Sequence, residues 1–174
     1  MQALGFFIPH KRSSPGFTLV ELLVCIGLLS VLSALAIPNW QRALERSRVE
    51  TARDQLINDL QTARIRALQR GEDLQIVRLR DCTWGVTAEN DWSCGWQLLA
   101  KTTQTVLYTS QLHAPLQVTF SKSTPLALNP RGDLGTVGDR WVIKSKLSTS
   151  PSIANVVCVS SASRLRWQAG ESCS

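Results

Sequence analysis

An apolar run stands near the start of the chain, from residue 17 to residue 37. It is long enough to cross a bilayer as a helix, which takes roughly 20 residues. Lys11 and Arg12 come just before it, and basic residues at that position hold the preceding segment in the cytoplasm. The pattern therefore predicts a membrane-spanning helix that is closed by Pro38.

Glu21 interrupts the apolar run close to its beginning. A charged side chain costs about 2.5–3.5 kcal/mol at the centre of a membrane helix, and less near an end. Such a residue needs a partner, so Glu21 is a candidate functional residue. A secretory signal peptide, cleaved near the small residues 33–36, is the alternative. The length of the run and its carboxylate favour a helix that is retained.

A second helical pattern follows the proline, over residues 39–70. Apolar side chains recur there at steps of three and four and form one stripe: Val49, Ala52, Leu56, Leu60, Ala63 and Ala67. Glu50 lies at ion-pair spacing from Arg46 and from Arg53 on the polar side. We expect a kink or weak point at Pro38, a C-terminal cap at Gly71, and a sheet against the stripe.

Only strands are predicted beyond Gly71. Short apolar or alternating segments are separated there by turns rich in Gly, Pro, Asn and Asp. The expected strands cover residues 74–80, 95–99, 105–108, 116–120, 125–128, 140–144, 154–159 and 164–168. A long N-terminal helix followed by short strands indicates an α+β fold, with the helix packed on an antiparallel sheet.

Composition agrees with a folded domain carrying an appendage. Of the 174 residues, 44% are hydrophobic and 18% charged, and the net charge of +6 permits contact with an anionic surface without requiring it. Four cysteines in the polar part allow three pairings, and sequence neighbours suggest Cys82 with Cys94 and Cys158 with Cys173. Such disulfides form in an oxidising compartment such as a periplasm. A zinc site is the rival interpretation, and no C-x-x-C spacing or nearby histidine favours it.

Catalytic residues are scarce. The two histidines are His10 and His113, so no Ser/His/Asp or Cys/His constellation can be argued. The sequence also has no glycine-rich phosphate-binding loop. We therefore expect no enzymatic activity, no cofactor and no bound metal.

The segment Gly16-Phe17-Thr18-Leu19-Val20-Glu21 resembles the class III leader junction of type IV prepilins. Leader, glycine, phenylalanine, glutamate, apolar run and proline occur in the order of that family. The resemblance implies that a prepilin peptidase cuts after Gly16 and that Phe17 is then N-methylated. It divides the chain into a cleaved leader (1–16), a membrane and filament-core helix (17–38) and a periplasmic globular domain (39–174) with its helix at 39–70 and its sheet at 72–174.

The same resemblance implies that Glu21 and Pro38 act in assembly. In a filament, the Glu21 carboxylate would pair with the N-terminal amine of a neighbouring subunit, which satisfies two buried charges and fixes the register. The apolar helices would bundle in the filament core. The implied partners are other minor and major pilins, and the implied location is the inner membrane first and a cell-surface pilus afterwards.

Later motifs resemble the GspH/FimT domain family. They are the W-x-x-G-W pattern at residues 92–96, the proline-glycine turn at residues 128–132, and an Arg-x-Arg near the C-terminus. The resemblance implies a minor pilin or a minor pseudopilin. Ser163 departs from the pattern, since many members carry glycine there, a residue with greater backbone freedom. Cys25 in the apolar run is outside the pattern and is assigned no role.

Two basic pairs are candidate DNA ligands. Arg164 and Arg166 are two apart on an expected strand and so share a face, as do Lys144 and Lys146. On neighbouring strands these pairs would form a patch that neutralises phosphates. In some FimT-like minor pilins the Arg-x-Arg region binds DNA during uptake, so the resemblance implies double-stranded DNA as a partner. The alternative is that the arginines protect an edge strand from aggregation.

Most of the six tryptophans are expected to be core or loop anchors. Trp84 and Trp92, inside the loop that a Cys82–Cys94 bond would close, are expected to be exposed and to contact neighbouring subunits.

Three functions follow, in different classes. The chain is a minor pilin that primes or caps a type IV pilus, a tip receptor for DNA, or a minor pseudopilin of a type II secretion system; the first two are compatible. The two cysteine pairs and the Arg-x-Arg tail favour the pilus, and the pseudopilin is the alternative.

Overall fold

The computed structural model describes residues 16–83, 88–135, 138–147, 153–160 and 163–173, with the side chains of residues 34–38 excepted. The predicted leader up to residue 15, with His10, Lys11 and Arg12, and also Trp84, lie outside the described residues. The chain divides after Asn39 into two compact units.

One helix, α1 (Leu19–Arg70), contributes to both units. Its first turn is capped by Thr18, because Leu22 N donates to Thr18 O (3.1 Å) and Glu21 N to Thr18 Oγ1 (3.2 Å). In the first unit the described large apolar side chains of this helix, from Leu19 to Leu32, are exposed. Among the described residues, no helix is long and apolar enough to cross a membrane. The helix assignment runs unbroken through Pro38, whose side chain lies outside the described part.

The second unit is built on the rest of α1. All six members of the apolar stripe, from Val49 to Ala67, are buried in the core, so the predicted packing face is confirmed. The helix ends at Arg70 because Gly71 adopts a left-handed conformation (φ 62°) and donates its N–H to Ala67 O (2.9 Å).

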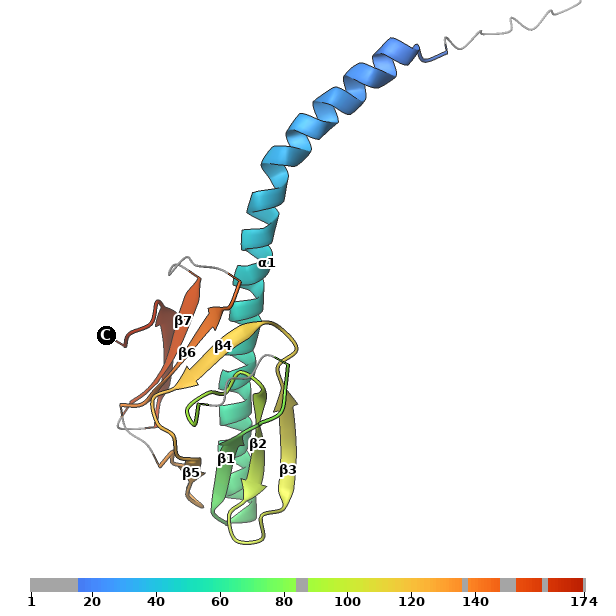
Figure 1. Ribbon diagram of the computed structural model, residues 1–174. Coiled ribbons are helices and arrows are strands. Elements are labelled where there is room, and N and C mark those ends of the chain that lie inside the picture. The colour runs from blue at the N-terminus through green and yellow to red at the C-terminus, as the bar shows by residue number, and fades with distance from the viewer. Residues whose placement is uncertain (1–15, 84–87, 136–137, 148–152, 161–162, 174) are drawn as a thin grey trace, which may run out of the picture. The chain divides into compact units, whose positions relative to one another are not determined.

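Two antiparallel sheets pack with α1, where the sequence had indicated one (Figure 1). The first has the order β3-β2-β1-β5 and consists of β1 (Leu74–Arg78), β2 (Gly95–Ala100), β3 (Val106–Gln111) and β5 (Leu126–Leu128). The second has the order β4-β6-β7-β8 and consists of β4 (Leu116–Phe120), β6 (Arg140–Ser145), β7 (Ala154–Val159) and β8 (Leu165–Ala169). The predicted α+β class is therefore confirmed.

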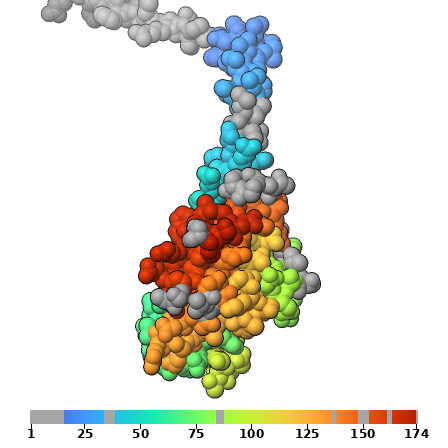
Figure 2. Space-filling view, turned by 90° about the vertical axis from the view of Figure 1, so that its left-hand side faces the viewer, coloured from blue at the N-terminus to red at the C-terminus, as the bar shows by residue number. Residues whose placement is uncertain are grey.

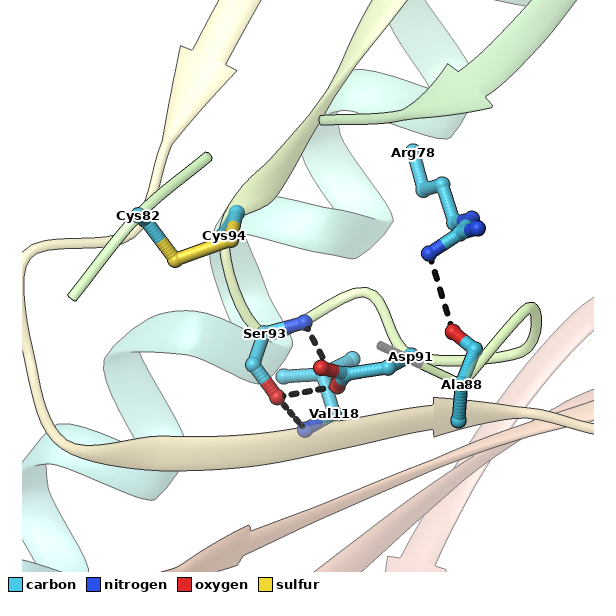
Figure 3. Close-up of a disulfide and its surroundings, with 7 residues drawn as sticks. All are labelled: Arg78, Cys82, Ala88, Asp91, Ser93, Cys94 and Val118. Carbon is cyan, nitrogen blue, oxygen red and sulfur yellow. Dashed lines mark hydrogen bonds between the residues drawn. A yellow bond between two sulfur atoms is a disulfide. The ribbon is translucent and has the colours of Figure 1, made fainter. Parts of the chain in front are cut away.

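An aromatic cluster joins the two sheets. Trp92 packs against Trp96, Phe120 and Trp141, with ring centroids 5.3–6.5 Å away. Trp92 is only 1% exposed, so the expectation that it lies on the surface is wrong. The reason is that the chain from Asp91 to Ser93 runs along β4: Trp92 N donates to Val118 O (2.7 Å), and Ser93 Oγ accepts from Val118 N (3.1 Å) (Figure 3).

Two disulfides close surface segments of the second unit. Cys82 is bonded to Cys94, with their Cα atoms 5.4 Å apart, and Cys158 to Cys173, with their Cα atoms 6.1 Å apart (Figure 3 shows the first). Figure 2 shows the C-terminal residues, in red, spread over one face of this unit.

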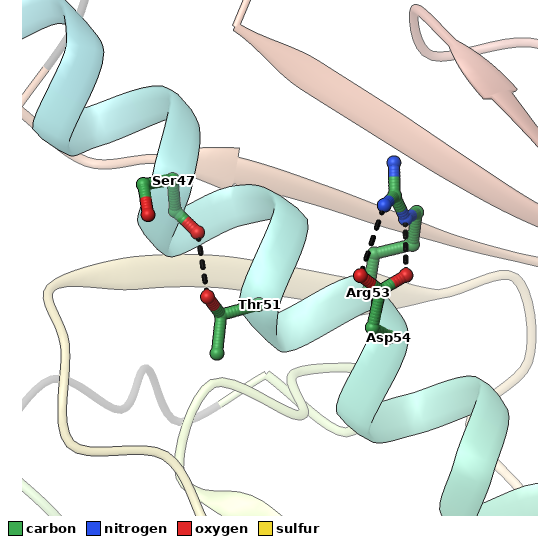
Figure 4. A network of polar contacts seen from close by, with 4 residues as sticks. All are labelled: Ser47, Thr51, Arg53 and Asp54. Atoms are coloured by element: carbon green, nitrogen blue, oxygen red, sulfur yellow. Dashed lines mark hydrogen bonds and ion pairs between the residues drawn. The ribbon is translucent and has the colours of Figure 1, made fainter.

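An expected ion pair on α1 is replaced by another. Glu50 forms no ion pair with Arg46 or Arg53 among the described residues. Arg53 instead pairs with Asp54 (2.8 Å, Figure 4) and stacks on the Trp167 ring, 3.8 Å from its centroid. Arg53 is buried beside Trp167 of β8, whereas Glu50 is exposed, and this explains the difference.

Candidate functional sites

The first candidate site is the start of α1. Gly16 and Phe17 precede the helix, and Phe17 is 72% exposed. A side chain at Gly16 would meet no atom within 4 Å, so nothing in the fold of this segment requires a glycine there. The Glu21 carboxylate has no partner among the described residues. Cys25, one turn later, is exposed and unbonded.

The second candidate site is the outer face of the second sheet, where the two basic pairs were expected to meet. The structure corrects this expectation, because β7 separates β6 from β8. The Lys144 residue of β6 is therefore two strands from Arg166 of β8, roughly 10 Å away across the sheet. Cys158 pairs with Arg140 on one side and with Arg166 on the other, so these three residues lie at the same level of the sheet. Lys144 is four residues beyond Arg140 on β6, which places it roughly 13 Å further along the strand direction.

Local partners distinguish the two pairs further. Lys144 is paired with Glu171 of the C-terminal segment (3.6 Å). Lys146 follows β6 and donates its backbone N–H to Pro115 O (3.0 Å), at the start of β4. Arg164, just before β8, and Arg166, within it, are exposed and form no ion pair with any described residue.

Arg140 takes the place that the lysines were expected to fill. It lies opposite Cys158, which lies opposite Arg166, so the three side chains share one face of the sheet. Arg140 is exposed and has no ion pair among the described residues. We call Arg140, Arg164 and Arg166 the arginine row. Sequence reasoning placed Arg140 only near the lysines, because strand order was missing.

A buried turn holds the arginine row in place. Ser163 has φ 53°, in the left-handed region that favours glycine. Its hydroxyl accepts a hydrogen bond from Leu134 N (3.0 Å). Arg64 of α1 donates from Nη1 to Ser163 O (2.9 Å) and from Nε to Gly132 O (2.8 Å). One helical side chain thus fixes both the proline-glycine turn and the approach to Arg164, a role that no sequence pattern indicated.

A polar contact ties α1 to the first sheet. Asp59 accepts hydrogen bonds from Trp96 Nε1 (2.9 Å) and Tyr108 Oη (2.8 Å). Burial raises the pKa of the Tyr108 phenol, and its hydrogen bond to Asp59 raises the pKa further. The described residues contain no cluster of His, Cys, Asp and Glu that could hold a metal ion.

Comparison with known proteins gives these sites a context. Residues 11–37 match the family described as Prokaryotic N-terminal methylation motif, and residues 52–163 match the family described as Type II transport protein GspH. Among solved structures, the fold is similar to that of the type IV minor pilin FimU of Pseudomonas aeruginosa strain PAO1. The TM-score is 0.57 at 21% identity, covering 71% of this chain and 90% of that one, and a second crystal form gives 0.53.

Curated relatives match shorter stretches. A fimbrial protein of Pseudomonas aeruginosa is 32% identical over 63 residues, 36% of this chain and 40% of that protein. The type IV major fimbrial protein FimA of Dichelobacter nodosus is 31% identical over 80 residues, 46% of this chain and 47% of that protein. The chain thus matches less than half the length of these relatives.

The fold and the prepilin-type start define a type IV pilin-like protein. Within that class, the chain belongs to the GspH family and is a GspH/FimT-like pilin with a prepilin leader.

Proposed function

We propose that this chain is a minor pilin, a structural subunit that primes or caps the assembly of a type IV pilus. The observation that carries the proposal is the start of α1, where exposed apolar side chains surround a carboxylate, Glu21, without a described partner. Neither feature is useful to an isolated subunit in water. The apolar side chains are buried when the helix lies in a membrane or among other pilin helices. The carboxylate also needs an opposite charge, which a neighbouring pilin can supply.

The proposed sequence of events begins in the inner membrane, with the second unit in the periplasm. A prepilin peptidase cleaves the bond between Gly16 and Phe17 and methylates the new N-terminus. Glu21 then pairs with the N-terminal amine of a neighbouring pilin, because a buried carboxylate and a buried ammonium each need an opposite charge. Pro38 marks the end of the apolar stretch of the helix.

The test is to follow the tagged full chain in its own cells. We expect it to lose residues 1–16 and to appear in pili sheared from the surface, whereas Glu21→Leu stays in the membrane fraction. A wild-type chain that is absent from pili, and whose deletion blocks protein secretion but leaves piliation intact, would instead support a minor pseudopilin of a type II secretion system.

A second candidate function is binding of double-stranded DNA by the arginine row. It is favoured by three exposed arginines that have no described ion pair and that occupy one end of one sheet face. Guanidinium groups bind phosphate strongly, and the row is held from behind by Arg64. Lys144 is a weaker candidate than the sequence suggested, because Glu171 already neutralises it.

Two charge-matched variants of the full chain test this function in a salt series. We expect Arg164→Gln/Arg166→Gln to abolish most DNA binding and to flatten the salt dependence by about 0.9 per lost phosphate contact. We expect Lys144→Gln/Lys146→Gln to change binding little. Equal effects of both variants would contradict a localised site, and salt-independent binding would contradict phosphate recognition.

A further inference from the structure

A second basic surface lies at the other end of the globular unit, where α1 enters it. Arg42, Arg46 and Arg48 are exposed within the first helical turns of this unit. None of their side chains has an ion pair or hydrogen bond with a described residue. Glu45 is the one carboxylate among residues 40–48, so this stretch is net positive.

Lys146 belongs to the same end of the molecule. Its backbone N–H donates a hydrogen bond to Pro115 O. The neighbours of Pro115, Ala114 and Leu116, line a pocket together with residues of α1 that include Arg48. The lysine that was expected beside the arginine row therefore lies near Arg48. We call Arg42, Arg46, Arg48 and Lys146 the basic collar.

An exposed tryptophan stands at the head of the collar. Trp40 is 69% exposed, whereas Trp92, Trp96 and Trp141 are buried. Leu44, four residues later, shares its face of the helix and is also exposed. Trp40 follows the apolar run by three residues, so chain connectivity alone keeps it within a few ångströms of the end of that run.

We propose that the basic collar and Trp40 bind the headgroup layer of an anionic phospholipid membrane. This inference rests on the proposed membrane anchor. Tryptophan rings gather at membrane–water interfaces, where their apolar body and N–H are both satisfied. Arginines close to the surface attract anionic headgroups, with about a fivefold gain in affinity for each one.

The collar differs from Lys11 and Arg12, the other basic residues next to the apolar run. Those two residues precede the apolar run and are predicted to leave with the leader, whereas the collar remains in the mature chain. The bound lipids would hold the globular unit down on the bilayer until the subunit is extracted into a filament.

The experiment uses the full chain, reconstituted in bilayer nanodiscs of phosphatidylcholine with or without phosphatidylglycerol. The retained lipids are counted by native mass spectrometry. We expect wild type to retain phosphatidylglycerol in preference to phosphatidylcholine. Removing three arginines, in Arg42→Gln/Arg46→Gln/Arg48→Gln, should reduce that preference by about a hundredfold. The matched control is Arg70→Gln/Lys101→Gln/Arg131→Gln, which removes the same charge; Arg70 lies roughly 30 Å along the helix from Arg48.

A second readout locates Trp40. Lipids brominated near the headgroup should quench wild-type fluorescence more than that of Trp40→Phe. Equal lipid preference in wild type and both charge variants, or equal quenching of wild type and Trp40→Phe, overturns the inference while leaving the anchor intact. A chain that incorporates into neither nanodisc contradicts the anchor itself, and the inference with it.

Discussion

The two units of this pilin treat apolar side chains in opposite ways. In the second unit, the α1 stripe from Val49 to Ala67 is sealed against two sheets. In the first unit, the same helix exposes its leucines and valines, with Leu29 at 61%. The second unit is stabilised by contacts within the chain. The apolar side chains of the first unit can be buried only by something outside the chain, such as a membrane or other helices. Substitutions in the first should therefore alter processing and assembly, and substitutions in the second should alter stability.

The largest effect should come from the residue with the fewest contacts. Since a side chain at Gly16 meets nothing, Gly16→Val should leave the melting temperature of the globular unit unchanged while cleavage after residue 16 stops. Intact mass and a thermal melt of the same preparation measure the two quantities. A lowered melting temperature would show that Gly16 is needed by the fold.

Leu56 and Leu29 allow the same truncation in each unit. Leu56 is 0% exposed, so Leu56→Ala should lower the free energy of unfolding by about 2–5 kcal/mol through lost burial and a cavity. Leu29→Ala removes the same atoms from the first unit and should change it by less than about 0.5 kcal/mol. Urea melts of the detergent-solubilised chain report both values, and similar losses would break the distinction between the units.

A smaller effect is expected at Ser163, which combines a left-handed backbone with a useful hydroxyl. Ser163→Ala keeps the strain and leaves Leu134 N without its acceptor, so it should destabilise the unit by about 1–2 kcal/mol. Ser163→Gly loses the same hydrogen bond but relieves the strain, and should be about 1 kcal/mol more stable than Ser163→Ala. A reversed order in chemical denaturation would show that the backbone angle carries no penalty.

The smallest effect concerns alkaline pH. The pKa of Tyr108 is raised in the folded state, so the unfolded chain releases this proton first. The resulting stability is fully present below the ordinary tyrosine pKa, near 10, and is lost as pH rises through the folded value. Tyr108→Phe should flatten the loss of stability above about pH 10, measured by thermal melts across pH. An unchanged profile would assign that loss to other groups.

Sequence patterns predicted what depends on local spacing. The stripe on α1, the cap at Gly71 and most strands follow from periodicity and turn residues near in sequence. The order of strands does not, which is why the lysines were placed beside Arg166 when β7 lies between them. Trp92 was misjudged for the same reason, because its burial depends on a backbone ladder with β4. The role of Arg64 was missed because its hydrogen-bond acceptors lie in two turns that are 68 and 99 residues further along the chain.

Those two hydrogen bonds also have a mechanical consequence. Arg64 joins α1 to loops that lead into both sheets, so a pull along the helix axis would load both of its hydrogen bonds at once. Replacing Arg64 by methionine would leave the buried stripe to resist sliding alone, and apolar contacts, which lack direction, resist sliding less than they resist separation. In the native chain, the Arg64 guanidinium is therefore a tether between α1 and the two turns at Gly132 and Ser163.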